Sequence, residues 1–385
     1  MGGTILSTEV AYQKEFIKGA IEGIIEQRVN TLEEAKKFAE TSKRRLIGIT
    51  IETRPDFCKE KDLDQMLYYG TTRVEIGIQT VYDDIYKLIK RGHTSVESIE
   101  AIRIAKDAGL KVNAHMMPNL PSSNYIKDLE MFDILFSNPD YCPDMLKIYP
   151  TIVIKGTELY DWWKQGKYIP YSEEELIDLI INVKKSLPPY VRIQRIMRDI
   201  PANLIEAGCK KSNLRQIVNE KLIQSNNKCN CIRCREFGII KRDNLIGNSA
   251  LEDVELIRYD YEASQGQEIF LSYENKEKKY LIGYLRLRKP SPFAHRSELN
   301  DGNTLIVREI RIVVELVPKN SIPENQGQIQ HRGYGKLLMK NAEKICIEDF
   351  NAKKLAVISG IGAKDWFFSL GYKRDGEVYV SKQLA

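Results

Sequence analysis

The sequence predicts an α/β protein built from three consecutive parts, and one observation supports each part. Residues 1–195 alternate short apolar strands with amphipathic helices. Residues 196–250 are basic and contain three closely spaced cysteines, and residues 251–385 combine several strands with a helix that follows a glycine-rich turn. The 385 residues exceed one average domain, and 43% hydrophobic residues are typical of a globular protein. We therefore expect two domains joined by a connector.

Repeated βα units dominate the first part. The expected strands are Leu46–Ile51, Arg73–Ile78, Leu110–Met116, Leu146–Tyr149 and Val191–Ile196. Helical patterns between them, such as Glu97–Ala108 and Glu173–Lys185, predict a parallel sheet with right-handed crossovers. The functional groups of β/α barrels gather at the carboxyl ends of the strands. Gln79 directly follows one strand, and its amide can donate and accept, so we predict that Gln79 contacts a cofactor.

The number of strands in the first part is too small for a closed barrel. The chain opens on Met1-Gly2-Gly3-Thr4 without a preceding strand. An open parallel edge would expose backbone donors and acceptors along its length. The sequence therefore predicts a β/α barrel that lacks its N-terminal portion.

The connector and its flanks are strongly basic. Residues 184–242 carry fourteen Lys and Arg against four Asp and Glu, a net charge of +10, whereas the whole chain carries +5. Such a run is often a solvated face, but the basic residues of Val191–Arg198 alternate with aliphatic ones, as on a strand with one basic face. The alternative is a polyanion partner. The predicted phosphate contacts are Arg192, Arg195, Arg198, Lys210 and Lys211.

Three cysteines of the connector, Cys229, Cys231 and Cys234, lie within six residues. Thiolates this close in sequence can converge on one tetrahedral zinc ion, so we predict a zinc site. The alternatives are three reduced thiols or an iron–sulfur cluster, whose common spacings differ from this one. Cys209 is either the fourth ligand or a small buried residue. The odd total of seven cysteines argues against a disulfide framework.

A glycine-rich turn, Gln330-His331-Arg332-Gly333-Tyr334-Gly335, opens an amphipathic helix in the third part. The expected apolar face of this helix comprises Leu337, Leu338, Met339, Ala342 and Ile345. Backbone N–H groups and the positive end of a helix can approach phosphate oxygens closely at such a turn. With its flanking elements, the turn resembles the acetyl-coenzyme A loop of the GNAT N-acetyltransferases. The surrounding strands are expected at Glu268–Tyr273, Tyr280–Leu287, Thr304–Val314, Lys354–Ile358 and near Glu377–Ser381, with a helix from Ala363.

Further motifs occur along nearly the whole chain. They include Gly2-Gly3-Thr4, Ile47–Asp56, Val74–Gln79, Arg91–Thr94, Ala114–Pro118, Arg198–Pro201, Phe270–Glu274 and Val357–Gly360. Together they resemble the catalytic subunit of the Elongator complex and its single-chain archaeal and bacterial relatives. The resemblance implies a radical S-adenosylmethionine domain with a 4Fe-4S cluster joined to a GNAT acetyltransferase domain. It also implies that an acetyl group from acetyl-coenzyme A becomes part of 5-carboxymethyluridine at the wobble position of transfer RNA, bound through its anticodon stem-loop.

The resemblance assigns residues to acetyl-coenzyme A. Glu309, Ile310, Arg311 and Ile312 would line the acetyl and pantetheine arm, and Gln330, Arg332, Gly333, Tyr334, Gly335, Lys336 and Leu337 would hold the pyrophosphate. Phe367 replaces a tyrosine of the family, so no phenol stands there to protonate the departing thiolate, although Phe367 can pack against the thioester. Glu309 is either a base for water or a carboxylate paired with Arg308 or Arg311.

The cysteine motif that binds the radical cluster in the family is absent from the sequence, and Cys58 and Cys142 cannot replace it. We expect a chain that binds transfer RNA and acetyl-coenzyme A and cleaves the thioester without radical chemistry. A protein lysine acetyltransferase and a non-catalytic RNA-binding scaffold are the alternatives. The absence of a long apolar run and of a signal peptide predicts a cytoplasmic protein without a membrane partner. Elongator-like subunits or a second copy of the chain are the expected protein partners.

Overall fold

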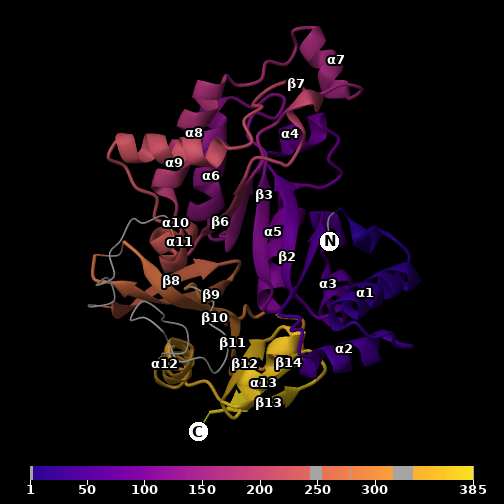
Figure 1. Cartoon of the computed structure of the whole chain (residues 1–385), viewed down its shortest axis with the longest axis vertical. Helices are drawn as coiled ribbons and strands as arrows, with labels where there is room; N and C mark the ends of the chain where they lie inside the picture. The colour runs from indigo at the N-terminus through magenta and orange to yellow at the C-terminus, as the bar shows by residue number, and fades with distance from the viewer. Residues whose placement is uncertain (1–2, 243–253, 278, 315–332, 385) are drawn as a thin grey trace. The chain divides into compact units, whose positions relative to one another are not determined.

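The computed structural model describes residues 3–242, 254–277, 279–314 and 333–384 (Figure 1). Its helices in these ranges are α1 Val10–Ile25, α2 Leu32–Thr41, α3 Glu60–Tyr68, α4 Asp83–Leu88, α5 Ser95–Asp107, α6 Tyr125–Ser137, α7 Glu158–Lys164, α8 Glu173–Ser186, α9 Leu214–Gln224, α10 Ile232–Arg235, α11 Phe237–Arg242, α12 Tyr334–Glu348 and α13 Lys364–Phe368. The strands are β1 Ile49–Thr53, β2 Thr71–Gln79, β3 Lys111–Met116, β4 Met145–Ile148, β5 Val153–Ile154, β6 Arg192–Ile196, β7 Ile205–Ala207, β8 Val254–Ala263, β9 Gly266–Asn275, β10 Leu281–Lys289, β11 Thr304–Ile312, β12 Lys354–Ile358, β13 Lys373–Asp375 and β14 Tyr379–Gln383.

The first sheet confirms the repeated βα units. Its strand order is β1-β2-β3-β4-β6, and β4 pairs in parallel with both β3 and β6. Each of the five strands overlaps a predicted one within about three residues, because the apolar side chains of these strands are buried. The sheet is open, with β1 and β6 as its edge strands, as expected for five strands that do not close into a barrel.

The second sheet has the mostly antiparallel plan expected for an acetyltransferase. Its order is β13-β14-β12-β11-β10-β9-β8. The exception is the parallel pair β11–β12, whose register runs from Thr304↔Lys354 to Val307↔Val357. Beyond Val307, β11 continues to Ile312 while paired with β10. The two parallel strands therefore part after Val307, and this separation shapes the site described below.

Strand β8 was not predicted, although it pairs with β9 along its whole length, from Val254↔Asn275 to Ala263↔Gly266. The hairpin turn is formed by Ser264 and Gln265, with φ angles of 48° and 61°. Hairpin turns with positive φ usually contain Gly, Asn or Asp, so this sequence does not reveal the turn.

Helix α12 packs on the second sheet through the apolar face that the sequence predicted. Leu338, Met339, Ala342 and Cys346 are buried in one cluster with residues of β9–β12 and β14. The structure differs from the predicted apolar face at Leu337, which is 43% exposed and lies outside the buried face.

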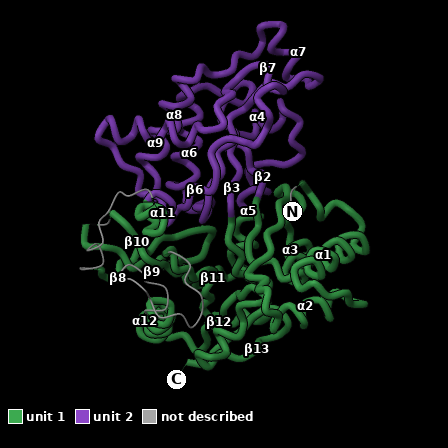
Figure 2. Tube along the Cα trace, in the orientation of Figure 1, with its two compact units in different colours: residues 1–75, 100–112, 235–385 green, residues 76–99, 113–234 purple. Residues whose placement is uncertain are grey.

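The chain divides into two compact units, shown in Figure 2. Unit 1 comprises residues 1–75, 100–112 and 235–385, and unit 2 comprises residues 76–99 and 113–234. The division differs from the predicted domain boundaries at residues 195 and 250, which remain predictions. Unit 1 thus joins part of the βα region to the whole of the second sheet.

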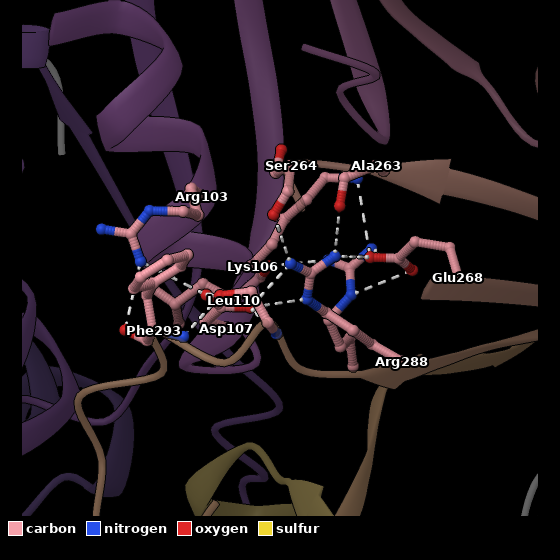
Figure 3. A network of polar contacts seen from close by, with 11 residues as sticks. Arg103, Lys106, Asp107, Leu110, Ala263, Ser264, Glu268, Arg288 and Phe293 are labelled. Carbon is pink, nitrogen blue, oxygen red and sulfur yellow. Dashed lines mark hydrogen bonds and ion pairs between the residues drawn. The ribbon is translucent and has the colours of Figure 1, made fainter. Parts of the chain in front are cut away.

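A buried network of charges holds these parts of unit 1 together (Figure 3). At the end of α5, one Asp107 oxygen accepts from Arg288 Nη2 at 2.6 Å and from the Ser291 N–H at 2.9 Å. Glu268 accepts from Arg288 Nη1 at 3.0 Å and from Arg308 Nη2 at 2.8 Å. These four charged side chains are at most 1% exposed. Each buried charge therefore has an opposite charge beside it, as burial requires.

Candidate functional site

Unit 1 contains a cavity of about 950 Å³ where β11 and β12 part. Strand β11 and the two residues after it supply a continuous wall from Val307 to Val314, and β12 and the turn after it supply Val357–Gly360. Gly335, Trp366 and Phe367 also line the cavity. The structure therefore brings Glu309, Ile310, Arg311, Ile312, Gly335 and Phe367, all predicted for one cofactor, to a single cavity.

The start of α12 has the backbone that an anion site needs. Gly333 caps the helix with a φ of 88°, a conformation that favours glycine. A side chain at Gly335 would place its Cβ 3.3 Å from the Trp366 ring. Lys336 and Leu337 are exposed in the first turn of the helix, and Tyr334 is half-buried against Tyr273. The predicted pyrophosphate contacts Gln330 and Arg332 lie outside the described residues.

Glu309 is held as an ion pair inside the cavity. Its carboxylate accepts from Arg286 Nε at 3.0 Å and from the Tyr284 hydroxyl at 3.1 Å. Burial alone would raise the pKa of Glu309, but the charges of Arg286, Lys111 and Arg311 lower it below its usual value. A carboxylate with a lowered pKa is a weak base, so the structure favours the ion-pair alternative. The hydrogen-bonded partner is Arg286 and neither Arg308, which binds Glu268, nor Arg311.

Phe367 is buried in the wall of the cavity, with its ring edge-on to Trp366 and Tyr372. Tyr372 does not replace the missing phenol, because its hydroxyl donates to Glu343 at 2.9 Å and it is not among the lining residues. The structure thus assigns Phe367 to packing, in agreement with its chemistry.

Several lining residues were not predicted from the sequence. Thr50, Thr72, Arg73 and Lys111 come from the βα region, at the amino-terminal ends of β1, β2 and β3. The sequence predicted functional residues at the carboxyl ends of these strands, where β/α barrels have their active sites. Thr50 lies within the motif Ile47–Asp56, whereas Thr72, Arg73 and Lys111 belong to none of the motifs named above.

The sulfur atoms of Cys229, Cys231 and Cys234, hereafter the cysteine cluster, lie within 4.8 Å of one another in unit 2. Hydrogen bonds from Cys229 and Cys234, with the charge of Lys184, lower the pKa of the buried Cys231 thiol. Lys184 Nζ lies 3.3 Å from Cys234 Sγ. Three converging sulfurs, one of them favoured as a thiolate, fit a soft divalent cation. Cys209 does not belong to this group, so the structure does not support it as a fourth ligand.

Comparisons with known proteins identify the family. The Radical SAM superfamily profile matches residues 9–134, and the Radical_SAM C-terminal domain profile matches residues 143–224. A tRNA uridine(34) acetyltransferase from Methanocaldococcus infernus is 46% identical over 100% of this chain and 71% of its own length. Elongator complex protein 3 from Saccharomyces cerevisiae is 42% identical over 100% of this chain and 68% of its own length. The chain belongs to the Elongator complex protein 3 family.

The fold of the family agrees with that of the chain. A solved structure of the Methanocaldococcus infernus family member with an N-terminal deletion matches with a TM-score of 0.94. It is 46% identical in sequence, and the match covers 100% of this chain and 89% of that chain. The radical S-adenosylmethionine region and the acetyltransferase sheet expected from the sequence are thereby confirmed as parts of one family fold.

The residues predicted to contact phosphates differ in accessibility. Arg195, Arg198, Lys210 and Lys211 are exposed, Arg195 in an ion pair with Asp199 at 2.8 Å. Arg192 is 5% exposed and donates to the Gln194 amide oxygen at 2.7 Å. A phosphate cannot reach a guanidinium buried in this way, so Arg192 is removed from the predicted set. Strand β6 carries both residues, but Arg192 faces the interior.

The Elongator complex protein 3 family implies S-adenosylmethionine and a 4Fe-4S cluster. Gln79 ends β2 with a φ of 76°, and its buried amide oxygen has no hydrogen-bond partner among the described atoms. This unpaired amide oxygen could accept a hydrogen bond from a cofactor.

Neither Cys58 nor Cys142 is placed to bind an iron–sulfur cluster. Cys142 Sγ donates to backbone oxygens, and Cys58 is buried. Apart from the cysteine cluster, the described residues contain no group of three cysteines that would fit the radical cluster.

Among the described residues, no helix combines the length and the apolar character needed to cross a bilayer.

Proposed function

We propose that this chain binds acetyl-coenzyme A in the cavity of unit 1 and cleaves its thioester in response to transfer RNA, as a step in modification of the wobble uridine. The observation that carries the proposal is the cavity between the parting strands β11 and β12, with the start of α12 beside it. The names of the relatives, tRNA uridine(34) acetyltransferase and Elongator complex protein 3, support the substrate.

Acetyl-coenzyme A fits the residues of the cavity. Its pyrophosphate would meet the N–H groups at Gly333–Gly335, at the start of α12. The pantetheine amides would pair with the backbone of β11 beyond Val307, which β12 leaves unpaired on that side. The acetyl group would then reach the apolar rings of Trp366 and Phe367.

The test is release of coenzyme A thiol from acetyl-coenzyme A by the whole chain, with and without transfer RNA. We expect release that depends on transfer RNA carrying a wobble uridine. Release that requires a lysine peptide instead would indicate a protein acetyltransferase. Transfer RNA binding without thiol release under either condition would indicate a scaffold.

We also propose that the cysteine cluster holds one zinc ion. The purified chain should contain zinc at one equivalent, and Cys231→Ser should lose it, because Cys231 is the buried member favoured as a thiolate. Cys346→Ser, in the buried face of α12, is the matched control and should keep the metal, because Cys346 does not belong to the cysteine cluster. Elemental analysis decides, and zinc retained by Cys231→Ser would refute the site.

The exposed basic residues of unit 2 are proposed to bind transfer RNA phosphates. Replacing Arg195 and Arg198 together by Glu should weaken binding at least about 10-fold and reduce the slope of log affinity against log salt by about 2, since each lost phosphate contact retains its counterions. The same charge change at Lys340 and Lys344, exposed on α12, is the control. Fluorescence anisotropy over a salt series measures both quantities. Equal slopes for the parent chain and the Arg195/Arg198 variant would show that this face is merely solvated.

A further inference from the structure

The cavity of unit 1 is completed by residues outside the acetyltransferase sheet. Thr50, Thr72, Arg73 and Lys111 stand at the amino-terminal ends of three strands of the first sheet. Two of them are cations. They face a cavity whose other charged lining residues include Glu309 and Arg311 from β11. The cavity therefore carries positive charge that the acetyltransferase sheet does not supply.

Lys111 is fixed close to the point where β11 and β12 part. The preceding residue, Leu110, accepts a hydrogen bond through its carbonyl oxygen from Arg308 Nη1 at 2.8 Å. Arg308 directly follows Val307, the last β11 residue paired with β12, and is itself held by Glu268 of the buried network. The charge of Lys111 acts on the neighbouring Glu309. Lys111 thus lines the cavity near the point where β11 and β12 part.

The described lining of the cavity lacks a phenol that could act as an acid. Phe367 stands where the family resemblance places a phenol. The hydroxyl of Tyr372 is bound to Glu343 and that of Tyr284 to Glu309. In the described part of the chain, no tyrosine lines the cavity. The described lining instead offers cations, among them Lys111 and Arg73, to the negative charge that develops when the thioester is attacked.

We propose that Lys111, with Arg73 as a second cation, stabilises the acetyl carbonyl oxygen during thioester cleavage. This inference rests on the proposed function of the cavity. Water oxygen bonds to the acetyl carbon, the C–S bond breaks, and sulfur leaves with the bonding electron pair. Of the two water protons, one ends on the thiol and one in solvent, and the acetyl group leaves as acetate. The ammonium and guanidinium groups remain protonated throughout.

The chemistry of the two cations suits this role. An ammonium offers three donors from one compact charge, so it can follow the carbonyl oxygen as its charge grows. Arg73 Nε is buried without a hydrogen-bond partner in the described structure, while Arg73 Nη2 lies 3.4 Å from Glu75. A donor aimed at a developing oxyanion in a water-poor site changes the rate by about 10²–10³.

The inference is tested by thiol release from acetyl-coenzyme A in the presence of transfer RNA. We expect Lys111→Met to lower kcat by about 100-fold while KM and the affinity for a non-cleavable thioether analogue stay within about 3-fold of the parent. Lys111→Arg, which keeps the charge, should retain most of the rate. Lys340→Met, at an exposed position on α12, is the control for loss of a lysine. Unfolding midpoints establish that each variant is folded.

A double variant separates catalysis from structure. If Lys111 served only to neutralise Glu309, the added change Glu309→Gln would restore the rate of Lys111→Met. The proposal expects no restoration, so recovery in the double variant would overturn it. An unchanged kcat for folded Lys111→Met would also overturn it, while leaving the proposed function standing if the parent cleaves the thioester. Absence of cleavage by the parent would instead refute the proposed function itself.

Discussion

Replacing Gly335 by Asp is expected to lower the affinity for acetyl-coenzyme A at least about 100-fold, or about 2.7 kcal/mol. Gly335 lies in the first turn of α12 and lines the cavity. A carboxylate there would stand against the pyrophosphate, and unit charges at about 4 Å repel by about 1–4 kcal/mol near a protein surface. An acidic residue in the first turn is favourable for the helix itself, so the variant should remain folded. Isothermal titration calorimetry measures the affinity.

Gly335→Ala is the matched control for this variant. It adds the same Cβ, 3.3 Å from the Trp366 ring, without the charge. We expect a loss of affinity well below that of Gly335→Asp, because only the contact with Trp366 must adjust. Equal affinities of the parent and Gly335→Asp would show that Gly333 and Gly335 only allow the helix to begin and do not bind the pyrophosphate.

Replacing Asp107 by Ala is expected to lower the free energy of unfolding of unit 1 by about 3–5 kcal/mol. The carboxylate receives hydrogen bonds from Arg288 and from both the N–H and the hydroxyl of Ser291. Its removal leaves the Arg288 guanidinium, which is 0% exposed, with only Glu268 and two carbonyl oxygens. A buried cation that loses one of its two counter-charges cannot recover hydration, which is why the expected loss is large.

The unfolding can be followed in unit 1 by itself. The chain has three tryptophans, and only Trp366 belongs to unit 1. In a background with Trp162→Phe and Trp163→Phe, urea unfolding monitored by tryptophan fluorescence reports that unit. Glu348→Ala, which removes an exposed ion pair with Lys344, should change the free energy by less than about 1 kcal/mol. An Asp107→Ala variant as stable as Glu348→Ala would refute the structural role of the network.

The sequence by itself determined the elements whose signals are local. Alternation and apolar runs predicted the five strands of the first sheet, and the apolar spacing of Leu338, Met339 and Ala342 predicted the buried face of α12. The cysteine cluster was predicted because three cysteines within six residues cannot lie far apart. The family resemblance predicted that Glu309–Ile312 line the cofactor site, because proteins that share these motifs also share the fold.

Only the tertiary structure decided which distant residues meet. Asp107 and Arg308 are 201 positions apart in the sequence, yet these two residues, Glu268 and Arg288 form one buried set of ion pairs. Lys111 lines the cavity next to Leu110, whose carbonyl oxygen accepts a hydrogen bond from Arg308. Arg192 is buried, whereas Arg195 on the same strand is exposed. The physical reason is that a charged side chain can be buried only beside an opposite charge, and that partner often comes from a distant part of the sequence. Those partners become neighbours only when the chain folds.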